Sequence, residues 1–355
     1  MYCQENKKYI AKITDKATKR KATKMKIAFF DAKPYDLPSF DAYAKEYGVV
    51  YKYFETKLNE DTVSLAAGFD GVCVFVNDTV NATVIDKLCD LGVKIIALRC
   101  AGFNNVDIQH AKDKMYVVRV PAYSPYAVAE HTIALLLTSI RRTHKAYIRS
   151  KDFNFSLSGL AGFDLFGKTV GVIGTGRIGK VFIDICQGFG MNILAFDKYP
   201  SYEIENERVK YVSLNTLLEK SDIISLHCPL TEETYHVIDA EAIKKCKNGF
   251  VLLNTSRGAL VDAEALLEGI KARKVGAACL DVYEEESDVF FEDNSGHIME
   301  DDTLARLISM PNVIVTSHQA FLTKEALSNI AEVTTKNIVE FFNSGNCENK
   351  VFYNI

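Results

Sequence analysis

Three glycines in the middle of the chain follow an apolar run and precede a stretch with helical periodicity. They are Gly174, Gly176 and Gly179. Glycines in this pattern let the backbone turn tightly and approach a pyrophosphate, which the free N–H groups of the following helix can bind. A second apolar run ends in Asp197, 18 residues after Gly179, close to the spacing of a ribose-binding carboxylate. Such a carboxylate would repel a 2′-phosphate, so the sequence predicts an NAD site rather than an NADP site; an ordinary glycine turn is the alternative.

Polar side chains also follow the later apolar runs, at positions that a parallel sheet would bring to one edge. Ligands of open α/β sheets bind beyond the carboxyl ends of the strands. Arg257 directly follows such a run, and its planar guanidinium suits bidentate binding of a carboxylate. His318 ends the run VIVTSH and is the best placed of the seven histidines for proton transfer. The other residues at these ends are His227, Cys228, Pro229, Asn254, Thr255, Ser256 and Asp281.

Three further acids follow Asp281 in the run VYEEES and could orient a histidine. We interpret Glu284 and Glu285 as a solvated acidic run. His131 lies inside a long apolar stretch, where a hydrogen-bonded core residue is expected rather than a catalyst. His227 precedes CPL, and we assign it to the wall of the cofactor site. We expect the remaining histidines to be solvated or hydrogen-bonded without a catalytic role: His110, His144, His236 and His297.

Alternating apolar runs and helical stretches predict the elements that must position these side chains. The first series contains the runs KIAFFD, GVCVFVND, VKIIALRCAG and YVVRVP. The second contains TVGVIG, NILAFD, DIISLHC, GFVLLNTS, GAACLD and NVIVTSH, which by count form a doubly wound unit of six strands. Continuous apolar strands alternating with helices are typical of parallel sheets covered on both faces. The predicted fold class is therefore α/β.

The longest helical stretch lies between the two series, over residues 124–150. Ser124 is placed to cap this helix and Pro125 to occupy its first turn. Its apolar residues are too many for one face of a surface helix, which predicts burial between domains or between subunits. We therefore expect a homodimer or a dimer-based tetramer.

Composition and charge exclude several classes of protein. A hydrophobic content of 48% and a charged content of 25% are typical of soluble globular proteins, and no apolar run has the length of about 18 residues that a membrane span needs. Residues 1–24 carry a net charge of +6 and the remainder carries −10, so the body is not expected to bind nucleic acid. We interpret the basic extension as flexible, with a targeting arm as the alternative. Nine scattered cysteines without a CxxC pair predict no metal site and a reducing, cytoplasmic location.

These motifs resemble those of the D-isomer-specific 2-hydroxyacid dehydrogenases, and among them the fermentative D-lactate dehydrogenases. In the second half the resemblance is carried by GVIGTGRIG, HCPLTEET, NTSRGALVD, LDVYEEES and TSHQAFLT, and in the first half by VFVND, LRCAGFNNVD and VPAYSPYAVAEHT. It implies a Rossmann-type NAD domain, residues 123–319, inserted into a flavodoxin-like substrate domain. That substrate domain would consist of residues 25–122 and 320–355, with a long interdomain or dimer helix near residues 125–149.

The resemblance also implies roles for individual residues. Arg257 corresponds to the family's essential arginine, Glu286 to its acid and His318 to its acid/base histidine. Many relatives have proline after the acid, where this chain has Ser287. The cofactor positions fall on Gly174, Gly176, Arg177, Ile178, Gly179, Asp197, Cys228, Pro229, Thr234, Thr255, Ser256 and Asp281. The substrate contacts fall on Asn77, Gly102, Tyr123 and Arg257, with Phe321 close by.

Reduction of a 2-keto acid needs a hydride, a proton and a clamp for the carboxylate. Arg257 would be the clamp, and His318, protonated and held by Glu286, would give its proton to the forming alkoxide. NADH would supply the hydride. We expect a small-molecule enzyme that reduces pyruvate to D-lactate in fermentation; a bulkier branched or aromatic keto acid is the alternative within this class. An NAD-sensing corepressor-like protein is a more distant alternative, which would not need these three side chains together.

Overall fold

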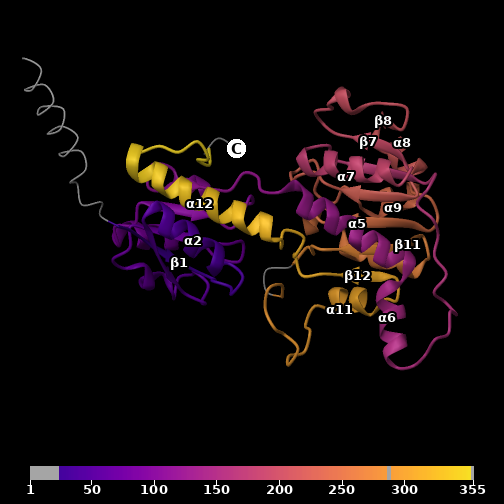
Figure 1. Cartoon of the computed structure of the whole chain (residues 1–355), viewed down its shortest axis with the longest axis horizontal. Coiled ribbons are helices and arrows are strands. Elements are labelled where there is room, and N and C mark those ends of the chain that lie inside the picture. The colour runs from indigo at the N-terminus through magenta and orange to yellow at the C-terminus, as the bar shows by residue number, and fades with distance from the viewer. Residues whose placement is uncertain (1–23, 286–288, 353–355) are drawn as a thin grey trace, which may run out of the picture. The chain divides into compact units, whose positions relative to one another are not determined.

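The computed structural model describes residues 24–285 and 289–352, which form two compact α/β units (Figure 1). The first unit ends at Pro121 and resumes at Ile330, and the second runs from Ala122 to Asn329. Residues 320–329, which the resemblance assigns to the substrate domain, group with the second unit. One reason is that the backbone N–H of Ala320 donates to a carboxylate of that unit. The predicted basic extension lies outside the described residues except for Lys24.

The first unit contains a five-stranded parallel sheet in the order β2-β1-β3-β4-β5, which is the flavodoxin-like order. Its strands are β1 (Met25–Phe29), β2 (Val49–Tyr53), β3 (Gly71–Val74), β4 (Ile95–Leu98) and β5 (Tyr116–Val118). The run that forms β2 is missing from the strands expected from the sequence. It lies at the edge of the sheet and alternates between exposed and less exposed residues, so it is not a continuous apolar run.

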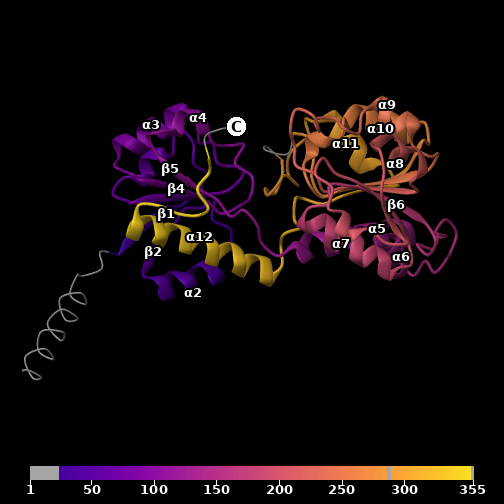
Figure 2. The ribbon, with the colours of Figure 1, turned by 90° about the horizontal axis from the view of Figure 1, so that it is seen from above.

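Helices cover both faces of this sheet. Figure 2 shows α2 (Leu37–Tyr47) and α12 (Lys324–Ser344) on one face, and α3 (Ala82–Asp90) and α4 (Ile108–Ala111) on the other. A short 3-10 turn, η1, spans Val63–Ala66. The C-terminal part of α12 completes this core: its Thr335 hydroxyl lies 2.9 Å from that of Tyr51 in β2, and its Phe341 ring lies 4.6 Å from that of Tyr116 in β5.

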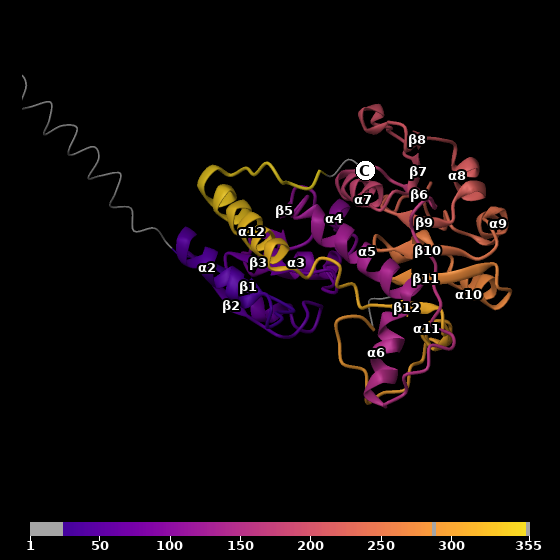
Figure 3. The same ribbon diagram turned by 45° about the vertical axis from the view of Figure 1, so that its right-hand side comes forward.

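The second unit contains a seven-stranded parallel sheet in the order β12-β11-β10-β9-β6-β7-β8 (Figure 3). Its strands are β6 (Thr169–Ile173), β7 (Asn192–Phe196), β8 (Val209–Tyr211), β9 (Ile223–Leu226), β10 (Phe250–Asn254), β11 (Val275–Leu280) and β12 (Val313–Val315). The strand order reverses between β6 and β9, where doubly wound sheets bind their ligands. The sequence predicts six of these strands; the seventh, β8, is a three-residue edge strand too short to form an apolar run.

The helices of the second unit also cover both faces of its sheet. Figure 2 shows α5 and α7 on one face and α8 to α11 on the other. Their bounds are α5 (Pro125–Arg141), α6 (Thr143–Lys151), α7 (Arg177–Gly188), α8 (Leu214–Lys220), α9 (Ala240–Lys245), α10 (Ala263–Lys271) and α11 (Asp302–Ser309), with 3-10 turns η2 (Tyr202–Ile204) and η3 (Gly258–Leu260). No helix in the described part of the chain has the length and apolar character needed to cross a bilayer.

The long helix predicted over residues 124–150 is two helices. Arg142 adopts a left-handed conformation, with φ of 51°, and separates α5 from α6. Ser124 and Pro125 occupy the predicted cap and first turn, although the Ser124 side chain makes no capping hydrogen bond. The apolar side of α5, including Ile133 and Leu136, packs in the core of its own unit. Its apolar residues alone therefore do not require a second subunit.

Candidate active site

The three glycines form a turn between β6 and α7, and each meets a different steric demand. Gly174 has a φ of 96°, and a Cβ there would lie 2.5 Å from the backbone nitrogen of Cys228. A Cβ on Gly179 would lie 2.1 Å from the carbonyl oxygen of Gly174, so the helix packs directly on the turn. Gly176 instead has open space around it, and no side chain caps the N–H groups at the start of α7. Open space beside free N–H groups fits a pyrophosphate.

Asp197 is fixed beside this turn at the carboxyl end of β7. Its Oδ2 accepts from the backbone N–H of Thr175 at 2.6 Å, and its Oδ1 accepts from that of Tyr199 at 2.8 Å. Oδ2 also accepts from the Thr175 hydroxyl at 3.1 Å, whereas Oδ1 keeps a lone pair with which it can accept from a ribose hydroxyl. The neighbouring Lys198 pairs with Glu233 at 2.6 Å, so its charge is already matched within the chain. The residues present fit NAD.

The other residues assigned to the cofactor line the start of α7 and the ends of β9 and β10. They are Arg177, Ile178, Cys228, Pro229, Thr234, Thr255 and Ser256. Hydroxyl groups connect these segments: Ser256 donates to the carbonyl of Cys228 at 2.7 Å, and Thr234 donates to that of Pro229 at 2.7 Å. The hydroxyl of Thr255 lies 2.8 Å from that of Thr132 in α5. These contacts give the carboxyl edge of the sheet a fixed shape.

His227 lies at this edge but is unsuited to proton transfer at neutral pH. Burial lowers its pKa to about 3, because the charged imidazolium would lose its hydration. Its Nε2 lies 2.8 Å from the hydroxyl of Ser225 in β9, and its ring packs on Phe182 at 4.9 Å. A neutral, packed imidazole agrees with its assignment to the wall of the site.

Asp281 is wholly buried at the end of β11 and holds the loop that follows β12. Its Oδ1 accepts from the hydroxyl of Thr316 at 2.6 Å, its Oδ2 accepts from the N–H of Ala320 at 2.8 Å, and its carbonyl accepts from the N–H of His318 at 2.7 Å. Burial raises the pKa of Asp281, but the hydrogen bonds it accepts from His131, Thr316 and Ala320 outweigh this and lower the pKa below 3.8. An ionised carboxylate thus fixes the loop. Motif analysis did not indicate this function for Asp281.

His318 is half-buried in that loop and has a left-handed backbone, with φ of 53°. Non-glycine residues in this region are strained and cluster at functional sites. Its ring packs against Phe291, with the centroids 5.7 Å apart, and Phe321 is buried just after it.

His131, expected to be a hydrogen-bonded residue of the long helix, has its Nε2 3.3 Å from the Thr316 hydroxyl.

Arg257 lies at the end of β10, in a turn that packs on the segment after β11. Its Nη1 donates to the carbonyl of Ser256 at 2.6 Å, and its own carbonyl accepts from the Asn254 amide at 2.8 Å. A Cβ on the next residue, Gly258, would lie 1.9 Å from the carbonyl oxygen of Tyr283. The arginine turn therefore contacts the backbone that leads toward residue 286. Glu286 and Ser287 themselves lie outside the described residues.

The expectation that Glu284 belongs to a solvated acidic run is wrong. The Oε1 of Glu284 lies 2.6 Å from Nε2 of His236, and both side chains are about three-quarters buried. The ring of Tyr235 stacks on His236 with the centroids 3.9 Å apart. The partners are far apart in sequence, so no local pattern could have indicated this pair. It fixes the start of the segment that follows β11.

The remaining substrate assignments divide between the two units. Asn77 and Gly102 follow β3 and β4 at the carboxyl edge of the first sheet, while Tyr123 and Phe321 belong to the second unit. In the second unit the structure brings the glycine turn, Arg257 and His318 to the carboxyl edge of one sheet, as the sequence predicts.

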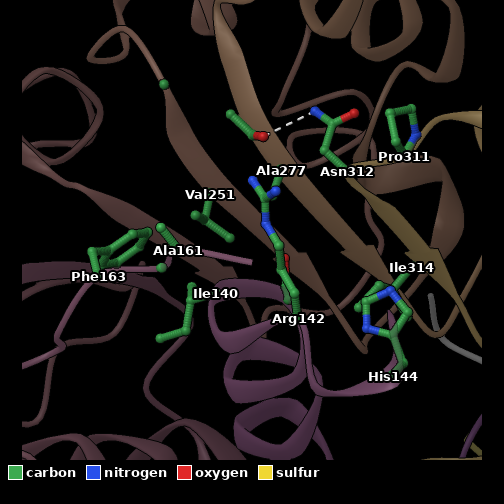
Figure 4. Close-up of a pocket in the computed structure, with 14 residues that line it drawn as sticks. Ile140, Arg142, His144, Ala161, Phe163, Val251, Ala277, Pro311, Asn312 and Ile314 are labelled. Atoms are coloured by element: carbon green, nitrogen blue, oxygen red, sulfur yellow. Dashed lines mark hydrogen bonds between the residues drawn. The ribbon is translucent and has the colours of Figure 1, made fainter. Parts of the chain in front are cut away.

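A cavity of about 220 Å³ in the second unit lies at the opposite, amino-terminal edge of its sheet (Figure 4). Arg142 and His144 line it from the junction of α5 and α6, facing Asn312, whose amide donates to the Gly276 carbonyl at 2.9 Å. Burial and the charge of Lys145 lower the pKa of His144. None of the residues assigned to substrate or cofactor lines this cavity.

Comparisons with known proteins find similar sequences over most of the chain. The family described as D-isomer specific 2-hydroxyacid dehydrogenase, NAD binding domain, matches residues 133–320. A 2-hydroxyacid dehydrogenase homolog of Haemophilus influenzae is 51% identical, over 92% of this chain and 99% of the relative. The D-lactate dehydrogenase of Escherichia coli is 48% identical, over 92% of this chain and all of the relative (100%). An aromatic 2-oxoacid reductase of Clostridium sporogenes is 42% identical, over 92% and 99%.

Solved structures are similar over the same length. The apo-structure of Escherichia coli D-lactate dehydrogenase has a TM-score of 0.85 at 46% identity, covering 92% of this chain and 100% of that one. The NAD-complexed form of a D-isomer specific 2-hydroxyacid dehydrogenase from Lactobacillus delbrueckii ssp. bulgaricus has a TM-score of 0.78 at 32% identity, covering 92% and 100%.

Proposed function

Because this chain belongs to the D-isomer-specific 2-hydroxyacid dehydrogenases, we propose that it reduces pyruvate to D-lactate with NADH. It is an NAD-dependent D-2-hydroxyacid dehydrogenase, and the corepressor-like alternative is therefore set aside. The observation that carries the proposal is the placement of Arg257 and His318 at the carboxyl edge that also holds the glycine turn. The full-length likeness to the Escherichia coli D-lactate dehydrogenase supports pyruvate as the substrate.

Arg257 binds the substrate carboxylate in this proposal. A guanidinium offers two parallel N–H groups to a carboxylate, and this fixes the orientation of the neighbouring keto group. One guanidinium nitrogen already donates to the Ser256 carbonyl, which limits the directions in which the remaining donors can point. We also assign to the substrate the side chains of Asn77, Tyr123 and Phe321 and the backbone near Gly102.

His318 supplies the proton. Its imidazolium donates to the carbonyl oxygen of the keto acid as negative charge develops there, and its own charge stabilises the forming alkoxide. Asp281 fixes the loop that carries His318, and we assign to Glu286 the role of holding the protonated ring. Bound NADH supplies the hydride, and its pyrophosphate would lie on the turn of Gly174, Gly176 and Gly179.

A bulkier substrate is the second candidate. The aromatic 2-oxoacid reductase of Clostridium sporogenes, 42% identical over nearly the whole length, favours testing aromatic keto acids alongside pyruvate. Apolar pockets discriminate weakly between side chains that differ by a few methylene groups. NADH consumption should be measured with pyruvate, a branched keto acid and phenylpyruvate, and the chirality of each product determined. A higher kcat/KM for phenylpyruvate than for pyruvate would replace the pyruvate assignment, and an L-product would contradict the family's stereochemistry.

We further propose a homodimer, or a tetramer built from dimers, in the cytoplasm. Self-association is supported by a set of large apolar side chains that are exposed in this structure: Tyr147, Ile148, Phe153, Phe155, Leu157 and Phe166. Several large apolar side chains exposed along one segment favour an interaction site. Free, mostly buried cysteines suit a reducing compartment. Light scattering that gives a monomer at micromolar concentration would contradict self-association.

A further inference from the structure

Arg99 is a buried charge in the first unit that the proposed chemistry does not use. It directly follows β4, and its side chain is 2% exposed. The guanidinium lies between two aromatic rings, with its Cζ 4.5 Å from the centroid of Phe29 and 4.6 Å from that of Phe75. Removing a guanidinium from water is costly unless it is hydrogen-bonded and paired. Its partners therefore indicate what the charge holds in place.

The guanidinium fixes the chain that leaves β1. Its Nη1 donates to the carbonyl of Phe30 at 3.1 Å and its Nη2 donates to that of Asp31 at 2.6 Å. Its Nε lies 3.5 Å from the carboxylate of Asp36, just before α2. A planar fork that binds two successive carbonyls sets the orientation of this segment, which a point charge could not do.

Arg99 also lies against the turn that carries Asn77. The guanidinium packs on the ring of Phe75, and Phe75 is the first residue of this turn. The turn is closed by the buried carboxylate of Asp78, which accepts from the N–H of Phe75 at 2.5 Å and from that of Leu58 at 2.6 Å. The Asn105 amide donates to the carbonyls of Phe75 and Asp78, each at 2.8 Å.

The backbone of Arg99 begins the segment that carries Gly102. Its N–H donates to the carbonyl of Val74 in β3 at 3.0 Å, and the thiol of the next residue, Cys100, donates to the carbonyl of Gly102 at 3.3 Å. One residue thus contacts both segments of the first unit that are assigned to the substrate. A buried charge contributes little to stability compared with an apolar side chain of the same volume, so a role in stability alone does not explain it.

We propose that Arg99 is a positioning residue that fixes the turn carrying Asn77 relative to the loop carrying Gly102, and thereby sets the affinity for the keto acid. This inference rests on the proposed function, because it assumes that these two segments bind the substrate.

The charge of Arg99 acts on the turn through Asp78. Burial raises the pKa of Asp78 to about 7, and the charge of Arg99 and the two backbone hydrogen bonds keep it from rising further. The other titratable groups that face Asp78 are the Asp31 carboxylate and the Cys73 thiol. Removing Arg99 raises the pKa of Asp78 further, so a smaller fraction of this carboxyl is ionised at neutral pH. A protonated carboxyl accepts fewer N–H bonds, and the turn then loosens.

The decisive variant is Arg99→Met, studied in the full chain with Arg99→Lys beside it. We expect Arg99→Met to raise KM for pyruvate by about tenfold or more, because small displacements of binding groups have large effects. The dissociation constant of NADH should stay within about twofold, since the residues assigned to the cofactor belong to the second unit. Arg99→Lys keeps the charge near Asp78 without the fork, so its KM should lie between those of Arg99→Met and the parent.

A pH series separates positioning from a purely structural role. The ratio of KM in Arg99→Met to KM in the parent should fall as pH rises above about 7, because the further raised pKa of Asp78 in the variant moves its ionisation, and with it the closing of the turn, to higher pH. Taking the ratio cancels the effects of pH that both proteins share. A ratio that does not change with pH, in a folded variant, would overturn the mechanism.

Two further variants keep the inference testable if Arg99→Met does not fold. Asn105→Ala removes both hydrogen bonds to the turn without removing a charge, and it should also raise KM for pyruvate. Leu88→Ala is the matched control, because it opens the buried core under α3 and lowers Tm without contacting the turn. Unchanged KM in Asn105→Ala, or an equal rise in Leu88→Ala, would overturn the proposal.

Amide hydrogen exchange distinguishes failure of this inference from failure of the proposed function. Exchange over residues 71–80 and 99–105 should accelerate in Arg99→Met or Asn105→Ala and stay at the parental rate in Leu88→Ala. If the parent reduces no keto acid, the proposed function fails while this measurement still tests the positioning. Unchanged exchange in both turn variants would overturn it whatever the activity.

Discussion

The two sheets of this enzyme present their carboxyl edges in different ways. The second unit offers a glycine turn with free N–H groups and open space, together with polar side chains on short loops. In the first unit, the segments at the carboxyl edge pack on a buried guanidinium and three buried carboxylates, Asp31, Asp36 and Asp78. In the second unit the site residues each follow a strand in the sequence, whereas in the first unit buried charges distant in sequence shape the edge. The comparison predicts that kcat depends mainly on the second unit and substrate affinity on both.

The largest expected effect is that of His318→Gln. Removing the proton donor should lower kcat by about 10²- to 10⁴-fold, which is the usual contribution of general acid catalysis. The dissociation constant of NADH should be unchanged, because the glycine turn remains. Steady-state kinetics with pyruvate and a fluorescence titration with NADH test both statements. Retention of near-full turnover would reduce His318 to a packing residue.

Arg257→Lys should have the next largest effect. The ammonium keeps the charge but cannot bind a carboxylate with two parallel N–H groups, so KM for pyruvate should rise and kcat should fall together. We expect kcat/KM to decrease by about 10- to 100-fold, given the strength of charge-assisted bidentate pairs. A combined loss would distinguish this clamp from Arg99, whose replacement should act mainly on KM. A kcat/KM close to that of the parent would exclude Arg257 as the clamp.

Cofactor preference tests the role of Asp197, which lies at the carboxyl end of β7. The parent should prefer NADH over NADPH by at least about tenfold in kcat/KM, because Asp197 would face the 2′-phosphate of NADPH. Asp197→Ala should narrow that preference. Lys198→Ala is the control: the charge it removes is already paired with Glu233, so the preference should persist. Comparable kcat/KM for both cofactors in the parent would contradict the role of Asp197.

The smallest expected effect is the pH dependence of the unfolding free energy, which has opposite signs in the two units. The folded-state pKa of Asp78 is about 7, above its ordinary value of 3.8, so its stabilising contribution is present below 3.8 and is lost as pH rises toward 7. The pKa of Asp281 is lowered, so its contribution is present above 3.8 and is lost at lower pH. Between pH 4 and 7 we expect the unfolding free energy of the first unit to fall, by a few kcal/mol at most.

Hydrogen exchange measured separately over the two units would test this difference in sign. Asp36, whose pKa burial also raises, acts in the same direction as Asp78. Asp78→Asn should therefore flatten the pH dependence of the first unit without abolishing it. The turn of residues 75–78 is left out of this comparison, because its own hydrogen bonds strengthen as Asp78 ionises. Protection that increases over this range elsewhere in the first unit would contradict the assignment of a neutral Asp78 at low pH.

Sequence predicted the second unit better than the first because each residue assigned to its site follows a strand that is itself a recognisable apolar run. The glycine turn, Asp197, Arg257 and His318 each follow an apolar run, so a parallel sheet places them on one edge. The edge strand β2 was not predicted, because it is not a continuous apolar run.

Long-range contacts account for the other differences from the predictions. The pair of Glu284 and His236 and the hydrogen bonds accepted by Asp281 join segments far apart in the chain. The break at Arg142 depends on a left-handed φ that a single arginine does not reveal. The role of Arg99 is visible only once β1, β3 and β4 are side by side.

The contact at Gly258 has a consequence for how this sequence can vary. Its backbone is outside the left-handed region, so conformational freedom is not what requires glycine there. The requirement is steric, because a single added carbon would meet the Tyr283 carbonyl at 1.9 Å. In a survey of all single substitutions, alanine and arginine should therefore fail alike at Gly258. Any replacement of Gly258 should lower activity, whatever the chemistry of the new side chain, because each one displaces the turn that carries Arg257.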